Sequence, residues 1–332
     1  MEFKVFEDMS GAFVFIAPGS QEASDKFDRM VEAFEDGLIH QRRMAAICES
    51  TIRDGRPLLR PYHILATIHL SKGKHAKALE TAVRGIRSVH RLIPDDFAGP
   101  FPWHQDGNRP YLALLKTILL CYIAEKEYGK AAKWCKLIQR ADPDDSCGMR
   151  FVIGHVLLRA GDDNQAHNWF TEHGDEYAPY FYDLGLSLFR QDKLVEAATA
   201  FRRGIAINPY IAEMIFYGYQ PNPYPVMHFW ANEKPPLAKL YLGSYGAIWE
   251  EAVEVQRFLY WLFNHSAVLA ERAKMMWCRE QRSIDLRLPQ PDAQVAHYRE
   301  LLAAIDDKLS SEIVQRRPNG EDDMEWPWQV YS

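Results

Sequence analysis

Residue types that carry chemistry are present in this sequence, but none stands in a spacing that a known reaction requires. Ser71–Lys77 has the lysines of a phosphate-binding loop, yet it lacks both the GxxxxGK spacing and a preceding strand. His63, His69 and His75 are six residues apart each time, so no two of them share one helical face as metal ligands. No serine or cysteine stands in a recognisable nucleophile motif. We therefore expect a protein that is not an enzyme and that holds no metal or cofactor.

The cysteines and the charge balance indicate a compartment and a class of partner. The five cysteines form no CxxC pair and leave an odd residue over, which is typical of reduced, buried thiols in the cytosol: Cys48, Cys121, Cys135, Cys147 and Cys278. The sequence has 39 Lys and Arg residues against 45 Asp and Glu residues, a net charge of −6, which disfavours nucleic acid as the partner. The longest apolar runs fall short of the roughly 20 residues that cross a bilayer, and the first residues do not resemble a secretion signal. We expect a cytoplasmic protein without membrane contact.

A recurring spacing of small residues predicts the architecture. Gly185, Ala197, Phe201 and Pro209 are separated by 12, 4 and 8 positions. Three earlier stretches repeat the gaps of 12 and 4, starting from Ala66, Leu119 and Gly154. Each unit has apolar residues at helical spacing on two stretches joined by a polar turn, which predicts a helical hairpin. Because one hairpin cannot bury its own apolar faces, the hairpins are expected to stack as a solenoid.

This pattern resembles the tetratricopeptide repeat, whose period is about 34 residues. Ala66 and Leu119 are 53 positions apart, which is one repeat plus an insertion that we place at 94–110. The resemblance implies an all-α chain whose repeats cover 21–213, including a degenerate first unit.

The segments on either side of the repeats have their own patterns. Alternating apolar residues predict a small β-hairpin at 1–20. A C-terminal helical module at 214–316 would cap the open end of the solenoid. The tail at 317–332 combines acidic residues with two tryptophans. A solubilising tail, a tail docked on its own chain and a peptide for another subunit or partner all fit that composition.

The tetratricopeptide resemblance also implies where a ligand binds, because the first helices of successive hairpins line a groove in that fold. Transferred to this sequence, the groove residues include one or more cations from each hairpin and, later in the chain, an aromatic residue: Arg60, His63, Lys116, His155, Arg159, Tyr182 and Arg190. A cationic, aromatic groove would take an acidic and aromatic segment. This chain's own tail has that composition, so it is one possible occupant. The alternative is that these cations are ordinary solvated helix ends.

The insertion at 94–110 is a second candidate site, since long loops without secondary structure are often functional. Trp103 and Arg109, together with His104, could form a stacking or anion-binding surface there. The alternative is that Phe101 and Trp103 fill the gap between two hairpins while Arg109 pairs with a nearby acid.

A narrower resemblance covers about 101–249. Asn108–Arg109–Pro110 and Asn208–Pro209–Tyr210 match segments of the tetratricopeptide proteins related to the suppression of tumorigenicity 7 family, and Asp142–Asp145 matches a turn approximately. The resemblance implies a scaffold or adaptor and no chemistry.

The sequence thus predicts a non-enzymatic adaptor that binds an acidic–aromatic protein segment in its groove. Two alternatives remain open at this point. The groove could bind single-stranded RNA, in which case affinity would fall steeply with salt. The chain could instead be a regulatory subunit of a partner enzyme or toxin.

Overall fold

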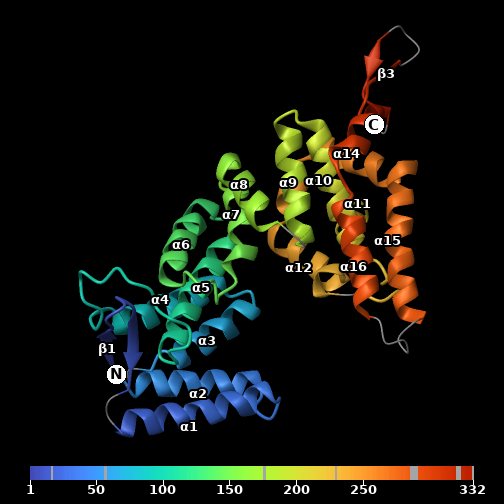
Figure 1. The fold of residues 1–332 in the computed structure, drawn as a ribbon. Coiled ribbons are helices and arrows are strands. Elements are labelled where there is room, and N and C mark those ends of the chain that lie inside the picture. The colour runs from blue at the N-terminus through green and yellow to red at the C-terminus, as the bar shows by residue number, and fades with distance from the viewer. Residues whose placement is uncertain are drawn as a thin grey trace. The chain divides into compact units, whose positions relative to one another are not determined.

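The structure is a computed structural model that describes residues 1–15, 18–55, 58–174, 177–228, 230–284, 291–318 and 323–330. The chain divides into two compact units, Met1–Val156 (unit 1) and Leu157–Ser332 (unit 2). Figure 1 shows the helices and strands of both units, coloured by residue number. The division falls inside helix α7 (Ile153–Arg159), within the range that the sequence assigns to repeats.

Unit 1 begins with an antiparallel pair of strands and continues with helices. The strands are β1 (Glu2–Val5) and β2 (Gly11–Val14), paired with Phe3 opposite Phe13, so the β-hairpin expected at 1–20 is present. The helices that follow are α1 (Pro18–Glu35), α2 (Gln41–Arg53), α3 (Arg60–Ser71), α4 (His75–His90), α5 (Asn108–Ala124) and α6 (Tyr128–Ala141), with a 3-10 turn η1 (Met149–Phe151) before α7.

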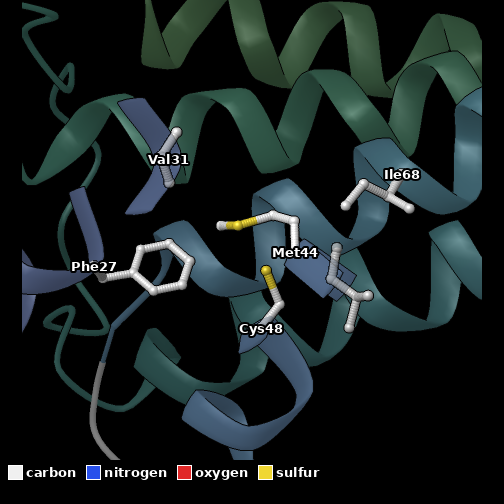
Figure 2. Packing of buried hydrophobic residues seen from close by; sticks show 6 residues of the cluster. Phe27, Val31, Met44, Cys48 and Ile68 are labelled. Atoms are coloured by element: carbon white, nitrogen blue, oxygen red, sulfur yellow. The ribbon is translucent and has the colours of Figure 1, made fainter. Parts of the chain in front are cut away.

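The helices of unit 1 pack with their neighbours along the chain. α2 contacts α3, α3 contacts α4, and both α3 and α4 contact α5, which in turn packs on α6. The turn between α3 and α4 contains Gly73 at a φ of +67°, a conformation that glycine adopts without strain. An apolar core lies between α1, α2 and α3, where Phe27 of α1 meets Met44 and Cys48 of α2 (Figure 2).

The insertion packs beneath the N-terminal strands. The rings of Phe3, Phe13, Phe97, Phe101 and Tyr111 form one aromatic cluster, with Phe101 stacked on Tyr111 at 4.7 Å between centroids. A side chain built at Gly99 would meet the Met9 carbonyl oxygen at 1.8 Å, so glycine is required for this close approach. The loop therefore belongs to the core of unit 1.

The first residue of α5 fixes the strands to that helix. Asn108 is fully buried; its Oδ1 accepts from the Phe13 N–H at 3.2 Å and its Nδ2 donates to the Gly11 carbonyl at 2.9 Å. The same Nδ2 donates to the Pro102 carbonyl at 3.1 Å. One amide side chain thus joins β2, the insertion and α5.

Unit 2 is helical apart from a short strand pair near its end. Its helices are α8 (Asp163–His173), α9 (Ala178–Arg190), α10 (Leu194–Ile207), α11 (Pro209–Tyr217), α12 (Pro235–Tyr245), α13 (Ala247–Glu250), α14 (Val253–Asn264), α15 (Ser266–Ile284), α16 (Pro291–Ala303) and α17 (Asp307–Ile313), with 3-10 turns η2 (Ala231–Glu233) and η3 (Pro327–Val330). The strands β3 (Arg317–Pro318) and β4 (Met324–Glu325) pair antiparallel.

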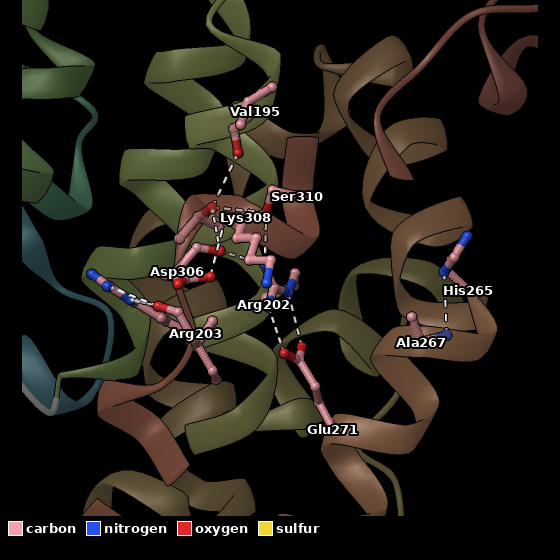
Figure 3. A network of polar contacts seen from close by, with 11 residues as sticks. Val195, Arg202, Arg203, His265, Ala267, Glu271, Asp306, Lys308 and Ser310 are labelled. Atoms are coloured by element: carbon pink, nitrogen blue, oxygen red, sulfur yellow. Dashed lines mark hydrogen bonds and ion pairs between the residues drawn. The ribbon is translucent and has the colours of Figure 1, made fainter. Parts of the chain in front are cut away.

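Helix α10 occupies the centre of unit 2 and contacts α9, α11, α14, α15 and α17. Arg202 of α10 is buried and forms an ion pair with Glu271 of α15. It also donates to the Asp306 carbonyl at 2.8 Å and to Ser310 Oγ at 2.7 Å, at the start of α17 (Figure 3). A single guanidinium on α10 therefore fastens two later helices.

The described end of the tail packs on its own unit. Trp328 of η3 is 2% exposed and lies 4.6 Å from the ring centroid of Phe258 and 5.3 Å from that of Trp261, both on α14. Trp326 stacks on Trp328 at 4.9 Å. Residues 319–322 and 331–332, which include part of the acidic run, lie outside the described residues.

The mostly helical fold that the sequence predicts is confirmed, with small strand pairs in addition. Three of the four helix pairs expected from the spacing of small residues pack together, as α3–α4, α5–α6 and α9–α10. The last of these pairs belongs to unit 2, with the helices that follow it.

Candidate functional site

A cavity of about 500 Å³ lies in unit 1. Its wall comes from α1, from the starts of α3 and α5, from the end of the insertion, and from Met1 and Phe15 beside the strands. Four of the nine residues that the sequence selects for binding line it: Arg60, His63, Trp103 and Arg109. We call this space the unit 1 cavity.

A repeated local motif brings the two arginines to this cavity. Arg60–Pro61–Tyr62 begins α3, and Arg109–Pro110–Tyr111 follows Asn108 in the first turn of α5. Proline is tolerated in the first helical turn because its missing N–H would have no helical partner there. Each arginine therefore stands at the first turn of its helix, and the packing of α3 against α5 puts both side chains on one cavity wall.

Both arginines are already paired with acids. Arg60 lies 2.8 Å from Oδ1 of Asp28 on α1. Arg109 lies 3.1 Å from Asp106, and its Nε donates to the Trp103 carbonyl at 3.0 Å. These pairs are partly or largely exposed, so each contributes little to stability and a ligand could exchange with it.

The α1 side of the cavity is acidic. Asp25, Asp28 and Glu32 line it from one face of the helix, since they are three and four residues apart. Burial raises the pKa of Asp28, against the opposing effect of Arg60, and the neighbouring Asp25 and Glu32 raise it further. Negative charges therefore crowd along this wall.

The remaining wall is apolar, aromatic or neutral. Phe15, Phe27, Leu58, Leu59 and Trp103 contribute apolar surface. Burial, with a smaller effect of Arg60, lowers the pKa of His63 to about 4, so this imidazole is neutral at pH 7. His63 adds polar surface and no positive charge.

The other predicted residues of unit 1 lie elsewhere. Lys116 Nζ donates to the Cys147 carbonyl at 2.5 Å, so it holds the loop that follows α6. His155 is fully buried. Neither residue lines the unit 1 cavity. The cavity therefore gives no support to the expectation that Lys116 and His155 face a ligand beside Arg60.

In unit 2, two predicted groove residues are buried. The Arg159 side chain is 3% exposed; it binds both carboxylate oxygens of Asp183 and donates to the Tyr245 carbonyl at 3.0 and 2.8 Å. Tyr182 is fully buried and donates to the Asn208 carbonyl at 2.9 Å. Both were expected to face a ligand, and the structure corrects this: each holds the interior of unit 2 together.

Arg190 differs, because it is exposed and lines a shallow hollow of about 490 Å³ in unit 2. The other charged residues around this hollow are acids, Asp192, Glu251 and Glu254. Phe189, which also lines the hollow, lies 6.4 Å from Trp328 of the docked tail.

The cysteine thiols have no environment for catalysis. All five are buried. Burial raises the pKa of Cys48, Cys135 and Cys147 to about 12 and that of Cys121 to about 11, so these thiols stay protonated at neutral pH. Across the described ranges, no three His, Cys, Asp or Glu residues are grouped as metal ligands would be.

Both arginines of the cavity wall are among the residues selected from the sequence, and none of its acids is. Asp25, Asp28 and Glu32 belong to the degenerate first unit, where no repeat register pointed to them. The duplicated Arg–Pro–Tyr motif could have linked Arg60 with Arg109. The two asparagines of the narrower resemblance, Asn108 and Asn208, are buried and hold separate segments together. Asn108 Nδ2 donates to the Gly11 carbonyl, and Asn208 Nδ2 donates to the carbonyls of Asn232 and Lys234.

Comparison of this chain with models of known protein families gives no match, and comparison with curated proteins gives no significant relative. No helix in the described parts of the chain has the length and apolar character that a membrane span requires.

Proposed function

We propose that this protein is a non-enzymatic, cytoplasmic adaptor that binds a segment of a partner protein in the unit 1 cavity. One observation carries the proposal: two separate stretches of chain bring Arg60, His63, Trp103 and Arg109 to the wall of a single cavity of about 500 Å³. A wall that is part apolar and part charged suits a peptide, because apolar contacts supply affinity and charged contacts set its register.

The proposal includes a tetratricopeptide-type arrangement of the hairpins. In unit 1 the pair α3–α4 packs on the pair α5–α6, as consecutive repeats do. In unit 2 the spacing of small residues has a direct counterpart: a side chain built at Gly185 of α9 would meet the Phe201 ring of α10 at 2.6 Å. Small residues thus permit the close helix approach on which the resemblance rests.

The aromatic part of the predicted acidic–aromatic ligand fits this cavity. Phe15 and Trp103 are not fully buried and offer ring surface for an aromatic or aliphatic anchor. The acidic part meets Arg60 and Arg109 already paired with Asp28 and Asp106. The ligand that we propose therefore has an apolar anchor.

A peptide selection on the full chain tests the function. Random 12-residue peptides displayed on phage are selected on the wild-type protein, and the winners are synthesised with a fluorophore for anisotropy titrations. The variant Ala113→Trp fills the cavity from α5, and Ala46→Trp places the same side chain on an exposed position of α2 as its control.

We expect the selected peptides to bind Ala113→Trp at least tenfold more weakly than the wild type and to bind Ala46→Trp unchanged. Circular dichroism of both variants checks that they fold. A selection that yields no binders, or binders that do not distinguish the two variants, would contradict the proposal.

The alternative of RNA binding gains no support from this cavity. Its carboxylates would repel phosphates, and its guanidiniums already have acid partners. Affinity for single-stranded RNA that falls steeply with salt would reopen that alternative.

A further inference from the structure

The charge of the unit 1 cavity is opposite to what the sequence predicts. Of the described side chains that line it, four are carboxylates, Asp25, Asp28, Glu32 and Asp106, and two are guanidiniums, Arg60 and Arg109. Both guanidiniums are neutralised locally, by Asp28 and Asp106. His63 is uncharged at neutral pH. The side chains that line the cavity therefore carry more negative than positive charge.

That surplus charge has a defined place. Asp25 and Glu32, on α1, form no ion pair within the part of the chain that the structure describes. They stand seven residues apart, two helical turns, with Asp28 between them. Asp25 accepts a hydrogen bond from Gln21 of the same helix at 2.8 Å and is exposed. A ligand that follows this wall meets a row of carboxylates.

Part of the cavity wall suits a long apolar stem. Trp103 is 36% exposed and Phe15 is only partly buried, so both present ring surface to the cavity. The methylene groups of lysine and arginine cover such surfaces while their charged ends reach acids or water. An accessible indole face also attracts a cation.

We infer that the unit 1 cavity selects a segment of a partner protein that carries a lysine or arginine side chain, with the charged end on the α1 carboxylates and the stem against Phe15 and Trp103. The inference rests on the proposed function and specifies its ligand. It reverses the sign of the charge expected from the sequence while keeping the apolar anchor.

The test uses the peptides selected on the wild-type protein and two matched double variants of α1. Asp25→Asn/Glu32→Gln removes two charges from the cavity wall and leaves the Asp28–Arg60 pair intact. Glu22→Gln/Glu35→Gln removes two charges from exposed positions of the same helix that do not line the cavity. The net charge of the protein changes equally in both.

We expect the selected peptides to be enriched in lysine or arginine next to an apolar residue. They should bind Asp25→Asn/Glu32→Gln roughly tenfold more weakly than the wild type, since two exposed charge contacts are lost. Their affinity for Glu22→Gln/Glu35→Gln should stay within about twofold, and replacing the basic residue by norleucine should abolish the difference between the variants.

Two outcomes overturn the inference and leave the proposed function standing: cavity-dependent peptides that are acidic, or basic peptides that bind both double variants alike. Failure of the proposed function has a separate signature, the absence of any peptide sensitive to Ala113→Trp.

Discussion

The arginines of this molecule differ in burial, and each one's role depends on whether its ion pair with an acid is buried or exposed. Arg159 is buried with Asp183 in the interior of unit 2. Arg60 and Arg109 instead form partly or largely exposed ion pairs, with Asp28 and Asp106, at the unit 1 cavity. Removing one member of the buried pair would leave an uncompensated charge in the interior, which typically costs ~3–5 kcal/mol. The exposed pairs cost about 1 kcal/mol or less to break. Only the second kind can exchange with a ligand.

His63 gives the cavity a pH signature. Its pKa is about 4 in the folded protein against 6.5 for the unperturbed group, chiefly because of burial. Between these values the unfolded chain binds more protons than the folded one, so the free energy of unfolding falls as the pH drops from 6.5 towards 4. Glutamine does not titrate, so we expect the free energy of unfolding of His63→Gln to decrease less over this pH range than that of the wild type, by up to ~3 kcal/mol. Urea denaturation of wild type and variant from pH 7 to pH 4 measures it, and parallel curves would contradict it.

At the level of elements, the docking of the tail at 323–330 depends on few side chains. Trp328 contacts α14, and Arg316 lies over Trp326 at 4.9 Å. Burial of one indole contributes ~2–3 kcal/mol or somewhat more through aromatic contacts. Loss of this one side chain is therefore expected to weaken the docking of the tail on α14.

Replacing Trp328 should release the tail without unfolding unit 2. We expect Trp328→Ala to raise amide hydrogen exchange in 323–330 and in α14 at least tenfold, while α10 and α15 keep their protection. Trp277→Ala, at a 54% exposed position of α15, serves as the control and should change neither. Unchanged exchange in the tail of the Trp328 variant would show that other contacts hold it.

The sequence predicts the helices of this chain well because apolar periodicity and proline positions are local signals. Pro61 and Pro110 mark helix starts, and Gly185 with Phe201 marks a close helix pair. The cavity is harder to predict, because its charge depends on Asp28 meeting Arg60 across 32 positions of chain. The burial of Arg159 had one visible signal, namely Asp183 within the apolar face of α9, which needs a buried cation.

For the molecule as a whole, each of the two units contains an apolar cluster of its own. The cluster of Phe27, Met44 and Cys48 belongs to unit 1, and the packing around α10 with Arg202 belongs to unit 2. Clusters of this kind, one in each unit, favour separate cooperative units of unfolding.

A core substitution should then act on one unit. Met44→Ala, at a fully buried site of α2, is expected to lower the free energy of unfolding of residues 1–156 by ~2–5 kcal/mol. Hydrogen exchange across a urea series, followed by mass spectrometry, should show unchanged protection in 157–332. Equal losses in both ranges would mean that the chain unfolds as one.

The Asn108 contacts have a consequence for solubility. Its amide donates to the Gly11 carbonyl and accepts from the Phe13 N–H. A third strand pairing with β2 would use the same two groups, so the Asn108 side chain blocks strand addition at that edge. The margin of β1 has Glu2 and Lys4, charges that discourage another chain from adding there. Loss of the Asn108 amide would leave the Gly11 carbonyl and the Phe13 N–H without these partners, and we expect the exposed groups to favour concentration-dependent aggregation.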